Sequence, residues 1–404
     1  MTSSEWLSDE PWLRWRDEWS LEEDTIYLNH GSFGPSPRCV QEARRQWSQK
    51  LEAQPMNFFL RQLESHLDEA TAQLGDFVGA AAEDLLFVDN ATFGMNIVAA
   101  SVSLEPGDEV LLTDHEYGAV QRIWRETAKR AGAEVVIASL PFPITSAGEV
   151  VDHLFSHVTE RTKLIVVSHI TSPTAVIFPV AEICKKARGR RVPVCIDGPH
   201  AIAMVPLHLQ NLDCDYYVAS CHKWLSAPFG SGFLYVAKRR QSSMKPCITS
   251  WGGSLEGRPS SWQDEFRWIG TRDPAAFLSI PAAIDFLHDS GLEDFRHRTH
   301  ALASYTRERL IDLTGLTPPW PDDRNWYGSM ISLPLPHAPN APPAGVQRDP
   351  LQHDLWKRHR IEIPIIHWHG HRFLRVSCHL YNTQAEIDRM IDALKEMLAE
   401  EHVS

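Results

Sequence analysis

The sequence predicts an α/β fold in which a mostly parallel, seven-stranded sheet lies between helices. Short apolar runs rich in Val, Ile and Leu recur along the chain, and helical segments separate most of them. Such runs are typical of strands buried on both faces of a parallel sheet. The 404 residues, 43% hydrophobic and 23% charged, are enough for two domains of about 100–200 residues each.

The elements follow one another in the order that such a sheet requires. The seven expected strands cover residues 85–88, 109–112, 135–137, 163–167, 192–196, 216–219 and 232–236. Helices are expected from 90–92 to 101 and over 118–130, 180–188, 274–289, 292–313 and 384–400, with two short strands flanking a His-rich stretch at 367–371. We therefore predict an N-terminal arm (1–24), a large domain (25–274) and a smaller C-terminal α+β domain (275–404).

Composition argues against several classes of protein. The net charge of −13 disfavours nucleic-acid binding, because phosphate contacts need clustered Lys and Arg. The N-terminus lacks the pattern of a secretory signal, and no apolar run approaches the roughly 20 residues of a membrane span. Seven scattered cysteines without a C-x-x-C pair favour a reducing cytoplasm over a disulfide framework or zinc site.

Polar residues follow several strands, at the edge where ligands bind in parallel sheets. Lys223 lies in Ser220–Trp224, directly after one strand and before a turn of small residues. A lysine positioned and partly desolvated there can form a Schiff base, although a single such lysine is more often an ordinary surface residue. Neither G-x-G-x-x-G nor G-x-x-x-x-G-K-[ST] occurs, so no nucleotide motif competes for this edge.

Two further strand ends carry groups suited to a charged ring and a phosphate. Asp197 ends the preceding strand and can pair with a pyridinium nitrogen, or simply cap a helix. The Asn90-Ala91-Thr92 run lies between a strand and a helix, where backbone N–H groups and a hydroxyl can bind phosphate. Helix capping is the alternative for that run as well.

An aromatic ring and an arginine complete the set. Tyr117 follows Asp114-His115-Glu116 at a strand end, where its ring can stack on a planar cofactor or pack within the fold. Arg375 lies inside an apolar strand, so it needs an anion. A substrate carboxylate would suit its two-pronged guanidinium, and an interdomain salt bridge is the alternative.

Taken together and in this chain order, these residues resemble the fold-type I, pyridoxal 5′-phosphate (PLP) enzymes of the class V aminotransferase group. The resemblance covers about residues 27–390 and is strongest to isopenicillin N epimerase-like proteins. The motifs that carry the closer match are Tyr27–Gly34, Trp268–Pro274, Asp-x-x-His at 197–200, Arg-Val-Ser at 375–377 and Tyr381-Asn382-Thr383.

The resemblance implies a role for each matching position. Lys223 would carry PLP as a Schiff base, Asp197 would hold the ring nitrogen and His200 would lie near the phenolic oxygen. Tyr117 would stack on the ring. The further cofactor-binding residues would be Ala91, Thr92, Ser172, Ser220, His222, Gly270 and Thr271, with Thr271 reaching the phosphate of the other subunit of a homodimer. Asn29, His30 and Arg375 would bind the substrate.

One departure from the family bears on the reaction. Cysteine desulfurases of this group need a nucleophilic cysteine on a loop before the carboxylate-binding arginine, and residues 361–375 contain none. The His367-x-His369-x-His371 run offers a metal site as an alternative, but no Asp, Glu or Cys accompanies it at suitable spacing. We therefore expect no metal and no persulfide chemistry.

The expected substrate is a small molecule: an amino acid, or a peptide with a free amino-acid end. Lys223, Asp197 and Tyr117 are the expected catalytic residues, and Tyr117 or His30 is the candidate for a second acid opposite Lys223. Epimerisation at Cα is the first hypothesis. A C–S β-lyase or an aminotransferase shares the same cofactor site, and a non-catalytic PLP fold or a metal-binding protein is the alternative from another class.

Overall fold

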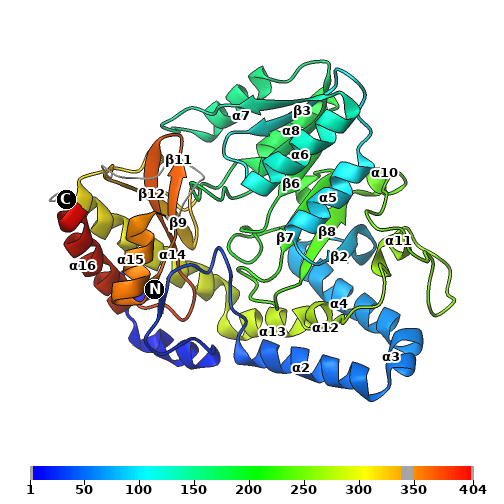
Figure 1. Ribbon diagram of the computed structural model, residues 1–404, viewed down its shortest axis with the longest axis horizontal. Helices are drawn as coiled ribbons and strands as arrows, with labels where there is room; N and C mark the ends of the chain where they lie inside the picture. Colours follow the sequence, from blue (N-terminus) through cyan, green and yellow to red (C-terminus); the bar gives the residue numbers. More distant parts are fainter. Residues whose placement is uncertain (1–2, 338–348, 402–404) are drawn as a thin grey trace.

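The central sheet has the strand order β2-β8-β7-β6-β5-β3-β4 in a computed structural model that describes residues 3–337 and 349–401 (Figure 1). Its strands are β2 (Leu85–Val88), β3 (Glu109–Thr113), β4 (Glu134–Ala138), β5 (Thr162–Ser168), β6 (Val194–Asp197), β7 (Tyr216–Ser220) and β8 (Gly232–Val236). All seven predicted strands are confirmed. Strand β8 runs in the direction opposite to the other six strands, which therefore present their carboxyl ends at one edge.

Helices cover both faces of this sheet because successive strand residues point to opposite sides. In β5, Leu164 and Val166 pack in the core beneath α5 (Ala91–Ser101) and α6 (Gly118–Ala131), whereas Ile165 and Val167 pack in the core on the other face. That second face is covered by α4 (Leu63–Val78), α7 (Ala147–Ser156), α8 (Val180–Arg190) and α13 (Ile280–Ser290). The inner strands are thereby buried on both sides, as their apolar runs predict, whereas the edge strand β4 is only partly buried.

Helices outside the predicted set extend the large body of the molecule. They are α2 (Arg38–Ala53), α3 (Pro55–Arg61), α9 (Leu209–Leu212), α10 (Lys238–Gln241), α11 (Asp264–Arg267), α12 (Ala275–Leu278) and the short 3-10 turn η2 (Ala82–Asp84). The sequence reasoning missed α2 because only Val40 and Leu51 of its residues are fully buried hydrophobics. The single helix predicted over 274–289 is two, α12 and α13, which meet at Ser279.

The C-terminal elements form a second, antiparallel sheet with the order β11-β12-β9. Its strands are β9 (Met330–Leu335), β11 (Ile365–Trp368) and β12 (His371–Ser377), and the helices beside it are α14 (Leu292–Thr314), α15 (Pro350–His359) and α16 (Gln384–Glu401). The two strands expected around the His-rich stretch exist, but the histidines lie in the hairpin itself rather than between the strands. Strand β9 and helix α15 were not predicted.

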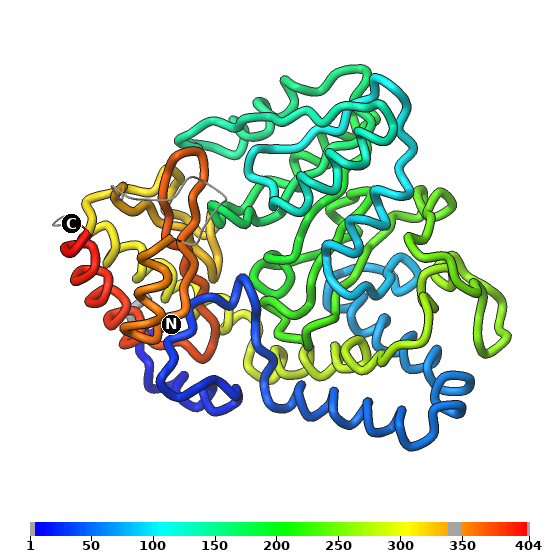
Figure 2. The backbone as a smooth tube through the Cα atoms, viewed as in Figure 1, coloured from blue at the N-terminus to red at the C-terminus, as the bar shows by residue number. Residues whose placement is uncertain are grey.

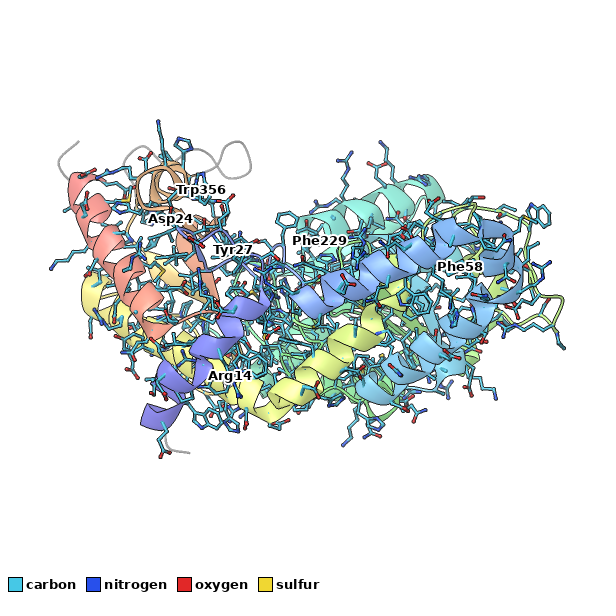
Figure 3. The ribbon with its side chains drawn as sticks, turned by 90° about the horizontal axis from the view of Figure 1, so that it is seen from below. Arg14, Asp24, Tyr27, Phe58, Phe229 and Trp356 are labelled. Atoms are coloured by element: carbon cyan, nitrogen blue, oxygen red, sulfur yellow. The ribbon has the colours of Figure 1, made fainter. Side chains whose placement is uncertain are left out.

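The N-terminal segment packs against these C-terminal elements (Figure 2). It contains α1 (Ser3–Leu7), η1 (Glu10–Glu18) and β1 (Ile26–Tyr27), which pairs in parallel with β10 (Ile361–Glu362). Arg16 donates to Glu386 at 2.7 Å. Seen from below, Tyr27 lies between the C-terminal helices and the start of α2, whereas Phe58 of α3 lies toward the opposite end of the molecule (Figure 3). The domain boundaries at 24 and 274 stay a prediction.

Within the described residues, none of the helices combines the length and the apolar character needed to cross a membrane.

Candidate active site

A cavity of about 440 Å³ opens where the carboxyl ends of five strands meet. The segments after β2, β3, β5, β6 and β7 contribute Thr92, Tyr117, Ser172, His200 and Lys223 respectively. The loop of residues 31–33 and Arg375 of β12 close the opposite side. The parallel sheet thus gathers on one edge the side chains that the sequence placed after its strands.

Lys223 lies in a tight turn directly beyond β7. Its carbonyl accepts the Ser226 N–H at 2.7 Å, and its Nζ lies 3.1 Å from His200 Nε2. Burial and the nearby Arg375 guanidinium lower the pKa of the Lys223 amine, although Asp197 opposes this shift. A larger fraction of the amine is therefore neutral near pH 7, and the neutral amine is the nucleophilic and basic form.

Asp197 ends β6 and is 5% exposed. Burial raises the pKa of its carboxyl group, and the Lys223 charge acts in the opposite direction. A protonated ring nitrogen placed beside this carboxylate would compensate its burial, because an opposite charge nearby favours the ionised form. The position therefore suits the role that the resemblance implies for Asp197.

The N-terminus of α5 forms the anion-binding part of the cavity. Asn90 caps the helix by accepting the Phe93 N–H at 2.9 Å, so the capping interpretation is correct for Asn90 itself. Ser220 Oγ accepts the Ala91 N–H at 3.0 Å, and Thr92 lines the cavity beside it. The positive end of an 11-residue helix with two hydroxyl groups beside it suits a phosphate.

Arg375 is 4% exposed and is held by neutral groups. One terminal nitrogen donates to Ser172 O at 2.8 Å and to Ser172 Oγ at 3.1 Å, and the other donates to Ser32 Oγ at 2.6 Å. Its Nε has no hydrogen-bond partner among residues 3–337 and 349–401. Burial lowers the pKa of Arg375 to about 10. No carboxylate in the described residues forms an ion pair with Arg375, which leaves its charge available to a substrate anion and removes the interdomain salt bridge as an explanation.

His222 and Tyr117 also line the cavity. Burial lowers the pKa of His222 to about 4, so its imidazole is neutral at physiological pH. Tyr117 precedes α6 and is 51% exposed, at the rim of the cavity. An exposed ring at this position is accessible for stacking on a planar ligand.

Asn29 and His30 do not line the cavity, in contrast to the substrate-binding role expected for them. Asn29 donates to Glu362 at 3.3 Å and forms a bridge with Ser377. His30 is fully buried behind the Lys223 turn. The next three residues of the same motif, Gly31 to Phe33, line the cavity instead. The motif therefore belongs to the site, but different members of it face the ligand.

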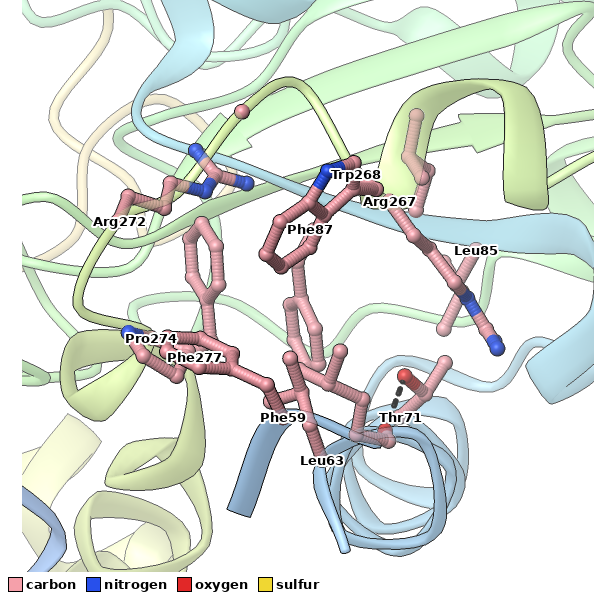
Figure 4. A pocket seen from close by; sticks show the side chains of 13 residues that line it. Phe59, Leu63, Thr71, Leu85, Phe87, Arg267, Trp268, Arg272, Pro274 and Phe277 are labelled. Atoms are coloured by element: carbon pink, nitrogen blue, oxygen red, sulfur yellow. Dashed lines mark hydrogen bonds between the residues drawn. The ribbon is translucent and has the colours of Figure 1, made fainter. Parts of the chain in front are cut away.

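Gly270 and Thr271 lie away from this cavity. Gly270 lines a separate apolar pocket together with Phe59, Trp268 and Phe277 (Figure 4). Thr271 is exposed. Neither residue reaches the cavity of its own chain, so a role in phosphate binding would require a second subunit, and it stays a prediction.

The three histidines of the 367–371 run are separated by the hairpin. His367 contacts Asp349 at 2.8 Å, His369 lies in the turn 3.6 Å from Asp114, and the His371 ring packs at a tilt against Phe142. They do not share one strand face as the metal hypothesis requires. Within residues 3–337 and 349–401, no group of three or more His, Cys, Asp or Glu side chains is arranged to hold a metal ion.

Two polar residues of the site were missed by sequence reasoning. Ser168, the last residue of β5, lines the cavity and pairs in register with Asp197. Its hydroxyl and N–H donate to the buried Glu116 at 2.7 and 3.1 Å, and Thr113 donates to the same carboxylate at 2.7 Å. Burial raises the pKa of Glu116 to about 7. The strand-end rule could have identified Ser168, but nothing in the sequence marks Glu116 as buried.

The composition of this cavity fits PLP. The N-terminus of α5 suits a phosphate, and the buried Asp197 suits a protonated ring nitrogen. The pKa of the Lys223 amine is lowered, which suits a Schiff base. Residues 26–390 match the family model for class-V aminotransferases. The chain belongs to this family, which confirms the predictions of the fold, of an enzyme and of PLP as its cofactor.

Three individual proteins are similar to this chain over at least 94% of its length. The chain is 38% identical to isopenicillin N epimerase of Amycolatopsis lactamdurans, over 96% of this chain and 98% of the relative. It is 34% identical to the enzyme of the same name from Streptomyces clavuligerus, over 96% and 99%. A putative L-cysteine desulfhydrase 1 of Oryza sativa subsp. japonica is 29% identical, over 94% and 84%.

Solved structures share the fold. The cysteine desulfurase CsdA from Escherichia coli superposes with a TM-score of 0.76 at 23% identity, covering 96% of this chain and 98% of that one. The cystine C-S lyase C-DES, in complex with its product cysteine persulfide, has a TM-score of 0.76 at 22% identity, covering 93% and 98%.

Proposed function

We propose that this protein is a PLP-dependent epimerase that inverts Cα of an amino acid, or of the amino-acid end of a small peptide. The observation that carries the proposal is the pairing, in one cavity, of the Lys223 amine with a buried arginine that forms no ion pair with a carboxylate in the part of the chain that the structure describes. The near full-length similarity to two isopenicillin N epimerases, at 38% and 34% identity, supports this reaction type.

Each residue of the cavity has a task in this mechanism. Bound PLP supplies an electron sink that stabilises negative charge at the substrate Cα. Arg375 orients the substrate by its carboxylate, with Ser32 and Ser172 fixing the guanidinium. The neutral Lys223 amine accepts the Cα proton as general base. With PLP bound, Asp197 would keep the ring nitrogen protonated, and Ala91, Thr92 and Ser220 would hold the phosphate. His200, 3.1 Å from Lys223 Nζ, steadies the amine.

Inversion also needs a proton donor on the face opposite Lys223. Tyr117 and His30 were the two candidates, and only Tyr117 lines the cavity. Its position at the exposed rim gives its hydroxyl access to solvent protons. We assign the second acid to Tyr117.

A C–S β-lyase is the second candidate, favoured by the 29% identity to a putative L-cysteine desulfhydrase. β-Elimination needs Lys223 and a leaving group but no second acid. Persulfide chemistry is disfavoured, because residues 361–375 contain no cysteine and Cys378 is fully buried in the C-terminal core.

Deuterium exchange separates the two reactions. The holoenzyme is incubated in deuterated water with each enantiomer of a panel of amino acids and small peptides. An epimerase will introduce deuterium at Cα and convert one enantiomer to the other while total amino acid is conserved. Release of pyruvate with ammonia or a thiol would instead establish the lyase.

A Tyr117→Phe variant tests the second acid. It keeps the aromatic ring and removes only the hydroxyl, so inversion should fall while Lys223-dependent Cα exchange with retention persists. Inversion at the wild-type rate in this variant would exclude Tyr117 as the donor.

We further propose that the enzyme is a homodimer in which Thr271 binds the partner's phosphate, and that it works in the reducing cytoplasm. The exposed position of Thr271 and the seven free cysteines support these proposals. Light scattering on the active holoenzyme tests the first, and a fully active monomer would refute it.

A further inference from the structure

A buried polar network lies directly behind the Lys223 turn. His30 Nε2 is 2.8 Å from the Lys223 carbonyl oxygen, and His30 Nδ1 is 2.9 Å from the Tyr381 hydroxyl. The His379 ring stacks on His30 with their centroids 4.1 Å apart. All three aromatic side chains are at most 1% exposed. The network therefore contacts the lysine through its backbone and has no access to substrate.

The hydrogen-bond chemistry determines the tautomer of His30. A carbonyl oxygen can only accept, so His30 Nε2 must carry the proton that it donates to Lys223 O. Burial lowers the pKa of His30 to about 3, so the imidazole is neutral and its Nδ1 is an acceptor. The Tyr381 hydroxyl is then the donor to Nδ1. The chain of donation runs from Tyr381 through His30 to Lys223.

The Lys223 carbonyl is held from two sides. Besides His30, it accepts the Ser226 N–H at 2.7 Å, which closes the turn. Ser226 has a φ of 58°, a left-handed conformation that costs free energy for a residue other than glycine. A turn that contains such a residue needs support from its surroundings, and the His30 hydrogen bond supplies part of it.

The loop that carries His30 fits closely against this turn. A Cβ atom on Gly34 would lie 2.5 Å from His30 Nε2 and 2.6 Å from the His222 carbonyl oxygen. Only glycine lets the chain pass at this distance. The Asn29–Gly34 motif thus serves two purposes: Ser32 orients Arg375, and His30 with Gly34 supports the Lys223 turn.

We propose that His30 is a positioning residue that fixes the backbone of Lys223, and that Tyr381 selects the tautomer in which it does so. This inference rests on the proposed role of Lys223 as the residue that carries PLP. It assigns His30 and Tyr381 to the alignment of the lysine with the cofactor, and it removes His30 from contact with the substrate.

The resting holoenzyme offers a readout that does not depend on turnover. The cofactor absorption and circular dichroism bands are titrated with pH in the absence of substrate, for the wild type, Tyr381→Phe and a control, Tyr327→Phe. Tyr327 is the control because it is also 1% exposed and its hydroxyl also donates a hydrogen bond, to Asp322, outside the network around His30.

We expect Tyr381→Phe to raise the midpoint of this titration by roughly 0.4–1 pH unit, the size expected when one buried hydrogen bond is weakened. The midpoint rises because the Lys223 turn is less firmly held in the variant. The Lys223 nitrogen is then less confined to the buried surroundings that disfavour its charged form. Tyr327→Phe should leave it unchanged. The charged and titratable groups around Lys223 are Asp197, His200, His222 and Arg375, and all are retained in both variants.

Two substitutions of His30 complete the experiment. A glutamine amide can still donate to the Lys223 carbonyl, so His30→Gln should shift the midpoint less than His30→Ala. A wild-type midpoint in Tyr381→Phe would overturn the inference, even if His30→Ala fails to fold. If wild-type protein shows no cofactor band and borohydride fixes no PLP on Lys223, the proposed function fails instead.

Discussion

The two walls of the active-site cavity are built in different ways. The wall that holds Lys223, Asp197 and Thr92 consists of strand ends in one sheet, and each residue is positioned by its own strand. The opposite wall consists of Ser32 from the N-terminal segment and Arg375 from β12, which meet although 343 positions separate them. The first wall follows from local sequence, whereas the second depends on packing between distant segments. Substitutions should therefore affect chemistry on the first wall and substrate binding or assembly on the second.

The largest effect is expected on the first wall, for Lys223→Ala. Loss of the general base should reduce turnover by about 10²–10⁴-fold and abolish covalent attachment of PLP. Borohydride reduction followed by peptide mapping checks the attachment. Reducible, covalently bound PLP in the variant would show that another residue carries the cofactor.

On the second wall, Arg375→Ala should raise KM for a carboxylate substrate while PLP stays bound. Removal of one partner of a buried, charge-assisted pair costs about 2–5 kcal/mol. Ser32→Ala, which removes only one of the hydrogen bonds that orient the guanidinium, should have a smaller effect in the same direction. Steady-state kinetics with cofactor content measured in parallel distinguishes this result from loss of PLP.

The buried Glu116, which hydrogen-bonds to Ser168 of the first wall, should make the stability of the protein depend on pH. Its pKa of about 7 in the folded protein lies above its ordinary value of 4.5. The carboxyl group therefore ionises at a lower pH in the unfolded chain, and the free energy of unfolding falls as pH rises from 4.5 to 7. Glu116→Gln removes the charge; its amide oxygen can accept from the Ser168 N–H and the Thr113 hydroxyl, and its NH2 can donate to the Ser168 hydroxyl, which then turns to accept. The variant should gain stability relative to wild type across that interval, by at most about 3 kcal/mol. Thermal or urea unfolding at pH 4.5 and pH 8 measures the difference, and a constant difference would contradict it.

The smallest expected effect concerns the close contact between the loop that carries His30 and the Lys223 turn. Gly34→Ala should destabilise the protein by roughly 1–3 kcal/mol, because the added methyl group meets His30 and the His222 backbone. Gly148→Ala is the control, since a Cβ there meets nothing within 4 Å and alanine favours its helix, α7. That control should be neutral or stabilising by up to about 1 kcal/mol. Equal melting temperatures for the two variants would show that the contact relaxes without cost.

The contrast between the walls also explains what could be predicted from sequence. Apolar runs identified every strand of the central sheet, and the residues after them identified Lys223, Asp197 and Tyr117. Ser168 was within reach of the same rule. The rule could not predict that Ser32, rather than His30, contacts Arg375. That depends on which side chains of one loop turn toward Arg375 and which turn toward Lys223. Helix α2 escaped detection since most of its surface is solvated, and α3 since its apolar run, Phe58-Phe59-Leu60, is too short to indicate a helix.

The network behind Lys223 also has a consequence for biosynthesis. His30 is among the first residues made, whereas its partners His379 and Tyr381 are among the last. Arg16 of the N-terminal arm likewise cannot form its hydrogen bond to Glu386 until that residue has been made. During translation the central sheet can be completed once residue 236 has left the ribosome, but the support for the lysine turn cannot form until the chain is nearly finished. A nascent chain would thus hold an assembled phosphate site beside an unsupported lysine, and we expect stable loading of the cofactor only after Tyr381 has been made and has packed against His30.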